Sequence, residues 1–200
     1  METKGMGKVI REILTETLEL KKRTLGDPTL LDEIEKVASV IVQAYRRGNK
    51  LILFGNGGSA ADAQHVAAEM VNKFELERDA IPTIALTTDT SILTSVANDD
   101  DFSHIFARQL EALVSRGDVA VAISTSGNSL NVLEGVRVAK ERGATTVGFT
   151  GMDGGRLVKL VDLVLRAPSE KTPRIQELHI TFFHIICHLV ETELFSTRNS

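Results

Sequence analysis

The sequence lacks tryptophan, contains one cysteine and draws only 4% of its 200 residues from aromatic types. Because Cys187 has no partner for an internal disulfide, which is the usual support of small secreted proteins, we expect a reducing, cytoplasmic setting. Few aromatic rings leave few surfaces on which nucleic-acid bases could stack, and a formal net charge of −4 does not favour a polyanion. The composition therefore argues against a nucleic-acid partner.

Long hydrophobic runs are also missing. Residues 1–11 mix charged side chains with glycines and lack the ~7–15 apolar residues of a signal peptide. The most apolar segment, residues 175–195, is interrupted by polar side chains, so we expect no membrane span. These side chains are Gln176, Glu177, His179, His184, His188, Glu191 and Glu193. With 42% hydrophobic and 25% charged residues, the chain has the composition of one globular domain.

The chain does contain a regular alternation of short apolar segments and helical patterns. Two helices are predicted first, from residue 5 to about 25 and from 28 to about 47, and Asp27 and Pro28 suit the start of the second. Strands are predicted at residues 50–54, 83–87, 118–123, 145–150 and 163–166, with helices between all of them and one after the last. This pattern predicts an α/β fold: a three-layer αβα sandwich with a doubly wound, five-stranded parallel sheet and an N-terminal helical hairpin. Ligands bind such sheets beyond the carboxyl ends of the strands.

A glycine-rich loop, Gly55-Asn56-Gly57-Gly58-Ser59, follows the first predicted strand and opens a helix. Glycines permit a tight turn and a close approach of a ligand to the backbone, and a helix start offers free N–H groups. Turns of this kind are common, so a purely structural loop and a site for an anion or a sugar are about equally supported. No Gly-Lys-Ser/Thr follows, which excludes a Walker loop.

A second loop, Ser124-Thr125-Ser126-Gly127-Asn128-Ser129, follows the third predicted strand and again opens a helix. Its hydroxyl, amide and N–H groups are hydrogen-bond donors that suit a phosphate. The alternative is an ordinary helix cap, but a cap needs one such residue rather than five. We therefore favour a phosphate site at this loop.

Candidate metal ligands and acid–base groups lie on two predicted helices. His65 and Glu69 are four residues apart, so they share one helix face and could ligate a divalent ion, although an ordinary i,i+4 pair is the simpler interpretation. The last helix carries Gln176, Glu177 and three of the five histidines, namely His179, His184 and His188. Spacing alone does not choose between His184 and His188.

Together the two loops resemble the sugar isomerase (SIS) domain family, which binds phosphosugars on a parallel αβα sandwich, and within it the phosphoheptose isomerases. The resemblance covers essentially the whole chain, including Val96-Ala97-Asn98-Asp99 and Arg174-Ile175-Gln176-Glu177-Leu178-His179. It implies a single SIS domain over residues 1–200. The helical pair at 1–48 would take part in oligomerisation, residues 49–200 would form a flavodoxin-like phosphosugar-binding core, and the assembly would be a homotetramer.

The resemblance also implies a metal site. Metal-binding members use a histidine and a glutamate on the first core helix and a glutamine and a histidine on the last, which are here His65, Glu69, Gln176 and His184. One Zn²⁺ per subunit is expected, although Mn²⁺ or Fe²⁺ would accept the same donors. Gln176 and His184 are ~12 Å apart along a straight helix. We therefore expect the site to be spread over several elements or chains.

The implied reaction converts sedoheptulose 7-phosphate to D-glycero-D-manno-heptose 7-phosphate through an enediol, as the first step of ADP- or GDP-heptose precursor biosynthesis for lipopolysaccharide. Glu69 would abstract the carbon-bound proton, His184 would act as its acid–base partner, and the metal would polarise the carbonyl. The residues expected to contact substrate are Asn56, Gly57, Gly58, Ser59, Glu69, Asn98, Asp99, Ser124, Thr125, Ser126, Ser129 and Gln176.

Two features qualify this interpretation. Pro173 stands where some members carry an acidic residue, which weakens the expectation of discrimination among heptoses. The main alternative is a non-catalytic SIS binding module that resembles the DnaA initiator-associating protein, which lacks the glutamate and the last-helix histidine. Because Glu69 and His184 are both present, we favour the enzyme. A phosphosugar enzyme of different chemistry would leave the His65–Glu69 pair unexplained.

Overall fold

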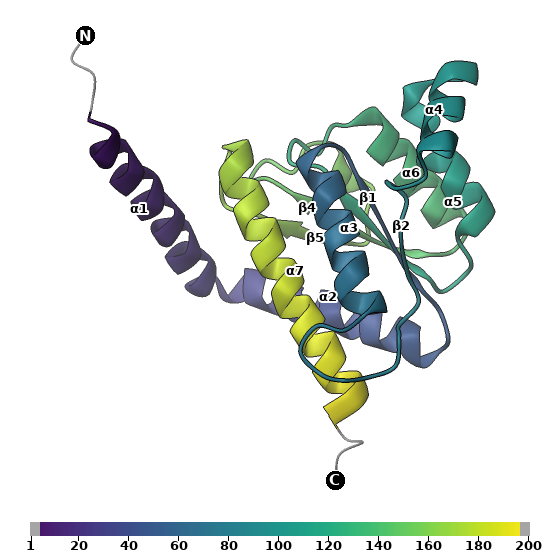
Figure 1. Cartoon of the computed structure of the whole chain (residues 1–200), viewed down its shortest axis with the longest axis horizontal. Coiled ribbons are helices and arrows are strands. Elements are labelled where there is room, and N and C mark those ends of the chain that lie inside the picture. Colours follow the sequence, from purple (N-terminus) through teal and green to yellow (C-terminus); the bar gives the residue numbers. More distant parts are fainter. Residues whose placement is uncertain (1–4, 197–200) are drawn as a thin grey trace.

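The computed structural model describes residues 5–196 and has a central parallel sheet with helices on both faces (Figure 1). The helices are α1 (Met6–Leu25), α2 (Pro28–Arg46), α3 (Gly58–Val71), α4 (Thr90–Asp99), α5 (Ala107–Leu113), α6 (Leu130–Glu141) and α7 (Thr172–Phe195). The strands are β1 (Leu51–Gly55), β2 (Thr83–Ala85), β3 (Val119–Ile123), β4 (Thr145–Thr150) and β5 (Leu163–Arg166). Short 3-10 turns lie at Phe102–His104 and Leu157–Lys159.

The sheet has the strand order β2-β1-β3-β4-β5, and every neighbouring pair is parallel. This confirms the predicted doubly wound fold. Gly55 at the end of β1 is paired with Ile123 at the end of β3. The glycine-rich loop and the serine-rich loop therefore leave the sheet side by side, at the carboxyl edge where the prediction placed the site.

Two hydrophobic layers hold the helices to the sheet, because successive side chains of a strand point to opposite faces. Leu51 and Leu53 of β1 pack with residues of α2, α3 and α7, whereas Ile52 and Phe54 pack with residues of α5 and α6. Every residue of β1 and β3 is buried. Their unbroken apolar sequences follow from this double coverage.

One predicted helix is wrong. Between β4 and β5 the chain forms only the 3-10 turn Leu157–Lys159 instead of a covering helix. Three glycines lie in the preceding segment. Gly154 and Gly155 have φ angles in the left-handed region, and Gly151 and Gly155 lie against other backbone. A Cβ on Gly155 would lie 2.4 Å from the carbonyl oxygen of Ser126. The segment is thus an irregular backbone support for the serine-rich loop.

The N-terminal helices are both present, and Asp27 caps α2 as predicted by accepting from the N–H groups of Thr29 and Leu30 at 3.1 and 3.2 Å. Helix α2 packs on the sheet and against α7. Helix α1 lies away from the sheet (Figure 1) and contacts the start of α7, where Arg174 donates to the Thr17 hydroxyl and Lys171 pairs with Glu16. The apolar side chains of α1 are largely solvent-exposed, among them Ile10, Ile13, Leu14 and Leu18.

Helix α7 is long and apolar enough to cross a membrane by length and composition, with a mean hydropathy of 1.2 over its most apolar window. Length and composition alone do not distinguish a membrane span from the core helix of a globular protein. In this structure α7 is a core helix, since Leu178, Phe182, Ile186 and Val190 are buried against the sheet and α2.

Helices α3 and α7 lie side by side and run in the same direction. Gln176 lies against Gly58 at the start of α3, His184 meets His65 in its middle, and Glu191 bonds to the segment that follows its end. The two helices that carry the predicted metal ligands are therefore neighbours over their whole shared length.

Candidate active site

The glycine-rich loop and the serine-rich loop are tied together by a reciprocal amide pair. Asn56 donates to Asn131 at 2.9 Å, and Asn131 donates back to Asn56 at 2.8 Å. Asn131 is buried in the first turn of α6, two residues beyond the serine-rich loop. The sequence analysis missed Asn131, because an asparagine in a helix start carries no signal until its partner is known.

The glycine-rich loop approaches its neighbours too closely for larger residues. Gly57 has a φ of 56°, in the left-handed region, and a Cβ on Gly58 would lie 2.3 Å from Nε2 of Gln176. Ser59 is buried, and its N–H donates to the carbonyl of Asn56 at 3.0 Å. The absence of a side chain at Gly58 thus lets α7 bring Gln176 against the loop.

Some donors of the serine-rich loop bond within the loop, since the N–H of Gly127 donates to the carbonyl of Ser124 and that of Asn128 to the Ser126 hydroxyl. Within residues 5–196 no side chain caps the first turn of α6, although Ser129 occupies the capping position. The Ser129 hydroxyl lies 3.1 Å from that of Ser124 instead. In contrast, α2 and α4 are capped by Asp27 and Asp89. The free N–H groups of α6 and the paired hydroxyls form a neutral donor set at a helix start, which suits an anion.

The loop between β4 and β5 supports the serine-rich loop from behind. Leu157 donates its N–H to the carbonyl of Gly127 at 3.0 Å, and Gly151 donates to that of Thr125 at 3.0 Å. The Arg156 N–H donates to Oδ1 of Asn128 at 3.1 Å. Backbone bonds therefore fix the shape of residues 124–129 before any ligand binds.

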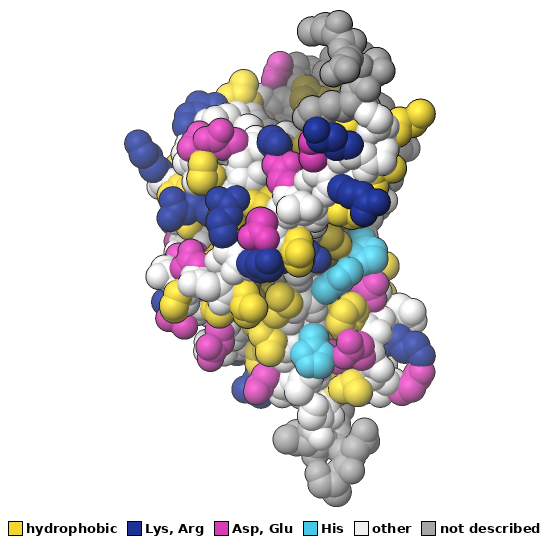
Figure 2. Space-filling model, turned by 90° about the vertical axis from the view of Figure 1, so that its left-hand side faces the viewer, with side chains coloured by type: hydrophobic (Ala, Val, Ile, Leu, Met, Phe, Trp, Pro, Cys, Tyr) yellow, Lys and Arg dark blue, Asp and Glu magenta, His cyan; other side chains and the backbone are white. Residues whose placement is uncertain are grey.

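His65, Glu69 and His184 meet between α3 and α7. The Nε2 atoms of His65 and His184 are 3.0 Å apart, and the same nitrogen of His65 lies 3.4 Å from a carboxylate oxygen of Glu69. The Phe74 ring lies 5.6 Å from the His184 ring. Figure 2 shows histidine side chains gathered on one face of the molecule, with acidic side chains beside them. The group is thus open to solvent on one side and backed by an aromatic ring.

These distances can be compared with those of a metal centre. Ligands ~2.0–2.1 Å from a tetrahedral ion lie about 3.3 Å from one another. The two distances from Nε2 of His65, to His184 and to Glu69, are close to that value, and all three side chains carry donor atoms that bind divalent ions. Among the residues that the structure describes, no three His, Cys, Asp or Glu side chains yet converge on one point as a ligand group. Gln176 lies against Gly58, nearer the start of both helices than the His65–Glu69–His184 group.

His188 takes no part in this group. It is exposed and bonded through Nδ1 to Glu75 at 2.7 Å. Of His184 and His188, between which spacing alone did not choose, it is His184 that lies against His65. His179 is also distinct: it is fully buried, its Nε2 lies 3.0 Å from the carbonyl of Thr150, and burial lowers its pKa to about 4.

Other predicted contacts lie apart. Asn98 and Asp99 are exposed at the end of α4, where Asn98 donates to Asp99 at 2.7 Å, and neither bonds to the two loops within the described part of the chain. Cys187 is buried, and burial raises the pKa of its thiol to about 12, so it is no nucleophile. Arg78 and Glu191, which connect the end of α3 to α7, were not singled out from the sequence.

Known proteins are similar to this chain over most of its length. A family model described as a SIS domain matches residues 19–151. A phosphoheptose isomerase from Clostridium acetobutylicum is 48% identical over 96% of this chain and 98% of its own length. One from Geobacter sp. (strain M21) is 58% identical over 83% of this chain and 86% of its own length.

Solved structures of phosphoheptose isomerases have the same fold as this chain. A phosphoheptose isomerase from Neisseria gonorrhoeae superposes with a TM-score of 0.88 at 38% identity, over 94% of this chain and 99% of that chain. One from Francisella tularensis superposes with a TM-score of 0.90 at 34% identity, over 95% of this chain and 100% of that chain. The similarity extends over nearly all of both chains in each case.

Proposed function

The chain belongs to the SIS domain family as a sugar phosphate isomerase similar to phosphoheptose isomerases, and from this premise we propose that it converts sedoheptulose 7-phosphate to D-glycero-D-manno-heptose 7-phosphate. The observation that carries the proposal is the meeting of His65, Glu69 and His184 between α3 and α7. This group supplies a carboxylate and imidazoles within hydrogen-bonding reach of one another, at a helix pair that also borders the glycine-rich loop.

Isomerisation of a ketose to an aldose moves a proton between two neighbouring carbons through an enediol. Glu69 is the proposed base that takes the carbon-bound proton and returns it to the adjacent carbon. His184 is its proposed acid–base partner, which moves protons between the substrate oxygens. The 3.0 Å spacing of His65 and His184 lets one imidazole hold the other in a fixed orientation by a hydrogen bond.

Substrate binding is assigned to the two loops. Ser124, Thr125, Ser126 and Ser129 are proposed to hold the phosphate with the free N–H groups at the start of α6. Asn56, Gly57, Gly58, Ser59 and Gln176 are proposed to contact the sugar. Asn98 and Asp99 stay in the proposed contact set on the resemblance alone, since their position on α4 gives them no support.

A divalent metal, in first place one Zn²⁺ per subunit, fits the donor chemistry of this group. His65, Glu69 and His184 would hold it, and Gln176 is the fourth ligand that the resemblance assigns. When bound, such an ion polarises a carbonyl oxygen and stabilises negative charge that develops on it. The mixed imidazole and carboxylate donors support Zn²⁺ first and Mn²⁺ or Fe²⁺ next.

We also propose a homotetramer in which α1 takes part in the assembly. The exposed apolar side chains of α1 support this, because a projecting helix with its apolar stripe in water gains stability when another chain covers it. An apolar groove between α2 and α7, lined by Leu31, Ile34, Val42, Ile185 and Leu189, offers a further surface of that kind. Light scattering at micromolar concentration tests the assembly, and a monomer would contradict it.

The experiment that tests the function is incubation of the purified protein with sedoheptulose 7-phosphate in D₂O, followed by NMR. We expect an aldose product with deuterium at the carbon that receives the proton, and a slower rate after treatment with a chelator that is restored by Zn²⁺. No conversion of the heptose by metal-loaded protein would overturn the proposal. As the resemblance implies, the product would enter ADP- or GDP-heptose precursor biosynthesis for lipopolysaccharide.

A further inference from the structure

Behind the His65–Glu69–His184 group lies a buried ion pair to which the proposed mechanism gives no role. The guanidinium of Arg78 donates through Nε to a carboxylate oxygen of Glu191 at 2.8 Å, and the two side chains are 1% and 2% exposed. Removing charges from water is costly unless every donor and acceptor is satisfied. The stability of this buried pair therefore depends on the hydrogen bonds that Arg78 and Glu191 make to other groups.

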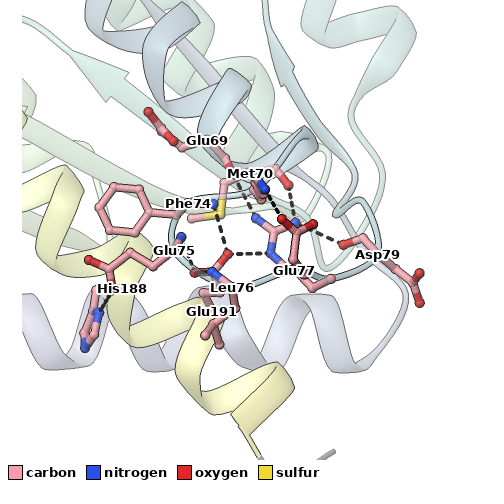
Figure 3. A network of polar contacts seen from close by, with 11 residues as sticks. Glu69, Met70, Phe74, Glu75, Leu76, Glu77, Asp79, His188 and Glu191 are labelled. Carbon is pink, nitrogen blue, oxygen red and sulfur yellow. Dashed lines mark hydrogen bonds and ion pairs between the residues drawn. The ribbon is translucent and has the colours of Figure 1, made fainter. Parts of the chain in front are cut away.

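Glu191 uses its remaining capacity on the segment that follows α3. Its carboxylate accepts from the N–H groups of Phe74, Glu75 and Leu76 at 3.0, 2.7 and 2.9 Å (Figure 3). Burial alone would raise the pKa of Glu191, but these N–H groups and the Arg78 guanidinium outweigh it and lower the pKa. The carboxylate is thus charged and holds three consecutive backbone amides to α7.

Arg78 uses its other two nitrogens on the end of α3. Nη2 donates to the carbonyl of Glu69 at 2.8 Å, and Nη1 donates to the carbonyl of Met70 at 2.9 Å. The last carbonyls of a helix have no partner within the helix, and a planar guanidinium can satisfy two of them while it pairs with a carboxylate. One of the two carbonyls belongs to Glu69 itself.

The Arg78–Glu191 ion pair is connected to His184 in two ways. Glu191 and His184 are seven residues apart on α7, so they lie on the same helix face two turns apart. Phe74, whose N–H bonds to Glu191, places its ring 5.6 Å from the His184 ring. Movement of the ion pair would therefore displace Glu69 on one helix and His184 on the other.

We propose that Arg78 and Glu191 are positioning residues that fix α3 against α7 and so hold Glu69 and His184 at their working distance. This inference rests on the proposed function, because it needs Glu69 and His184 to be the reacting groups. Neither Arg78 nor Glu191 touches substrate. Their effect falls on the turnover step, since a displacement of about 1 Å far from the chemistry can reduce a rate ~100-fold.

The test compares Glu191→Gln and Arg78→Lys with the wild type. Gln keeps the size of Glu191 but loses its charge, and Lys keeps the charge of Arg78 but cannot satisfy both carbonyls and the carboxylate. With sedoheptulose 7-phosphate as substrate and folded protein verified by circular dichroism, we expect kcat to fall at least ~10-fold and KM to change less than ~2-fold. If Glu191→Gln does not fold, Arg78→Lys decides the question.

A matched control lies directly before β3. Asp118 is also a buried carboxylate, which accepts from the N–H groups of Lys50 and Ser115 and pairs with Lys50 Nζ at 2.7 Å. Asp118→Asn is expected to lower the melting temperature as the Glu191 variant does, but to leave kcat unchanged. Equal losses of kcat in both variants would reduce the effect to general destabilisation and overturn the proposal.

The outcomes separate this inference from the function on which it rests. Wild-type protein that does not convert the heptose overturns the proposed function, and the positioning role falls with it. Active wild type together with folded Glu191→Gln and Arg78→Lys proteins of normal kcat overturns the positioning role alone. A loss of kcat in both variants, with Asp118→Asn fully active, supports both.

Discussion

At the scale of single residues, Glu69 is the side chain whose replacement we expect to reduce turnover most. Its carboxylate lies 3.4 Å from His65, and its carbonyl is held by Arg78. The change Glu69→Gln removes the base at nearly constant volume, so we expect kcat to fall ~100- to 10,000-fold without loss of the fold. The measurement is a steady-state assay together with the metal content of each protein, because Glu69 is also a proposed ligand.

The control for that experiment is Glu77→Gln. Glu77 is exposed and pairs with Lys73 on the same segment, so its loss removes one negative charge near the site without touching the His65 group. We expect normal turnover from this variant. A Glu69→Gln protein that retains near-normal kcat would remove Glu69 from the role of base.

The serine-rich loop leads to a different kinetic result. Ser124 and Ser126 lie at the proposed phosphate site, and the Ser126 hydroxyl accepts from the N–H of Asn128 at 3.2 Å. Contacts to a phosphate remote from the reacting carbons contribute equally to binding of substrate and transition state. Ser124→Ala and Ser126→Ala are therefore expected to raise KM several-fold with little change in kcat, and a loss confined to kcat would contradict the assignment.

At the scale of elements, much of the structure was predictable and the reasons are local. The unbroken apolar segments of β1 and β3 predict strands buried on both faces, and Asp27-Pro28 predicts the start of α2. The helix expected between β4 and β5 does not form, because the glycines there must lie against the backbone of the serine-rich loop. The Gly154-Gly155 pair is a local sign of a loop, but the contact that requires it depends on tertiary structure.

The candidate site was likewise predictable only in part. Four-residue spacing placed His65 and Glu69 on one face, but only the parallel packing of α3 and α7 shows that His184 rather than His188 joins them. The same packing puts Gln176 at Gly58, away from the level of His184, which the ~12 Å separation along the helix anticipated. Asn131, Arg78 and Glu191 escaped prediction because their roles arise from partners distant in sequence.

The start of α6 offers a test at this scale. Ser129 stands at the capping position, yet within the described residues no side chain caps the helix. A negative charge at a helix start interacts favourably with the helix dipole, so Ser129→Asp is expected to stabilise the helix by ~0.3–1 kcal/mol. The added carboxylate would repel the phosphate, so KM should rise while the melting temperature increases. Higher stability with unchanged KM would show that α6 begins as an ordinary helix.

At the scale of the whole molecule, His179 links folding to pH. It is fully buried, and burial lowers its pKa from the ordinary 6.5 to about 4. Between these values the folded chain keeps His179 neutral while the unfolded chain binds a proton, so the free energy of unfolding falls as the pH falls from 6.5 to 4. At pH 5 the loss from this one residue is about 2 kcal/mol.

The change His179→Gln tests that linkage. Denaturant unfolding at pH 7 and pH 5 should show that the difference in free energy of unfolding shrinks by about 2 kcal/mol in the variant. His188→Gln, which removes an exposed histidine from the same helix, should leave the difference as it is in the wild type. The carboxylates whose pKa is lowered, namely Asp101, Asp118, Asp162 and Glu191, act mainly at more acidic pH. An unchanged difference in His179→Gln would exclude His179 as the cause.

The parallel packing of α3 against α7 has a consequence for how the protein folds while the ribosome synthesises it. Helix α3 is made in the first half of the chain, whereas α7 follows all five strands. Until α7 has left the ribosome, His65 has no histidine opposite it, residues 74–76 have no carboxylate to bind, and the face of the sheet that α7 covers is exposed. The growing chain is therefore a target for chaperones at that face, and it acquires its reacting group only with its last helix.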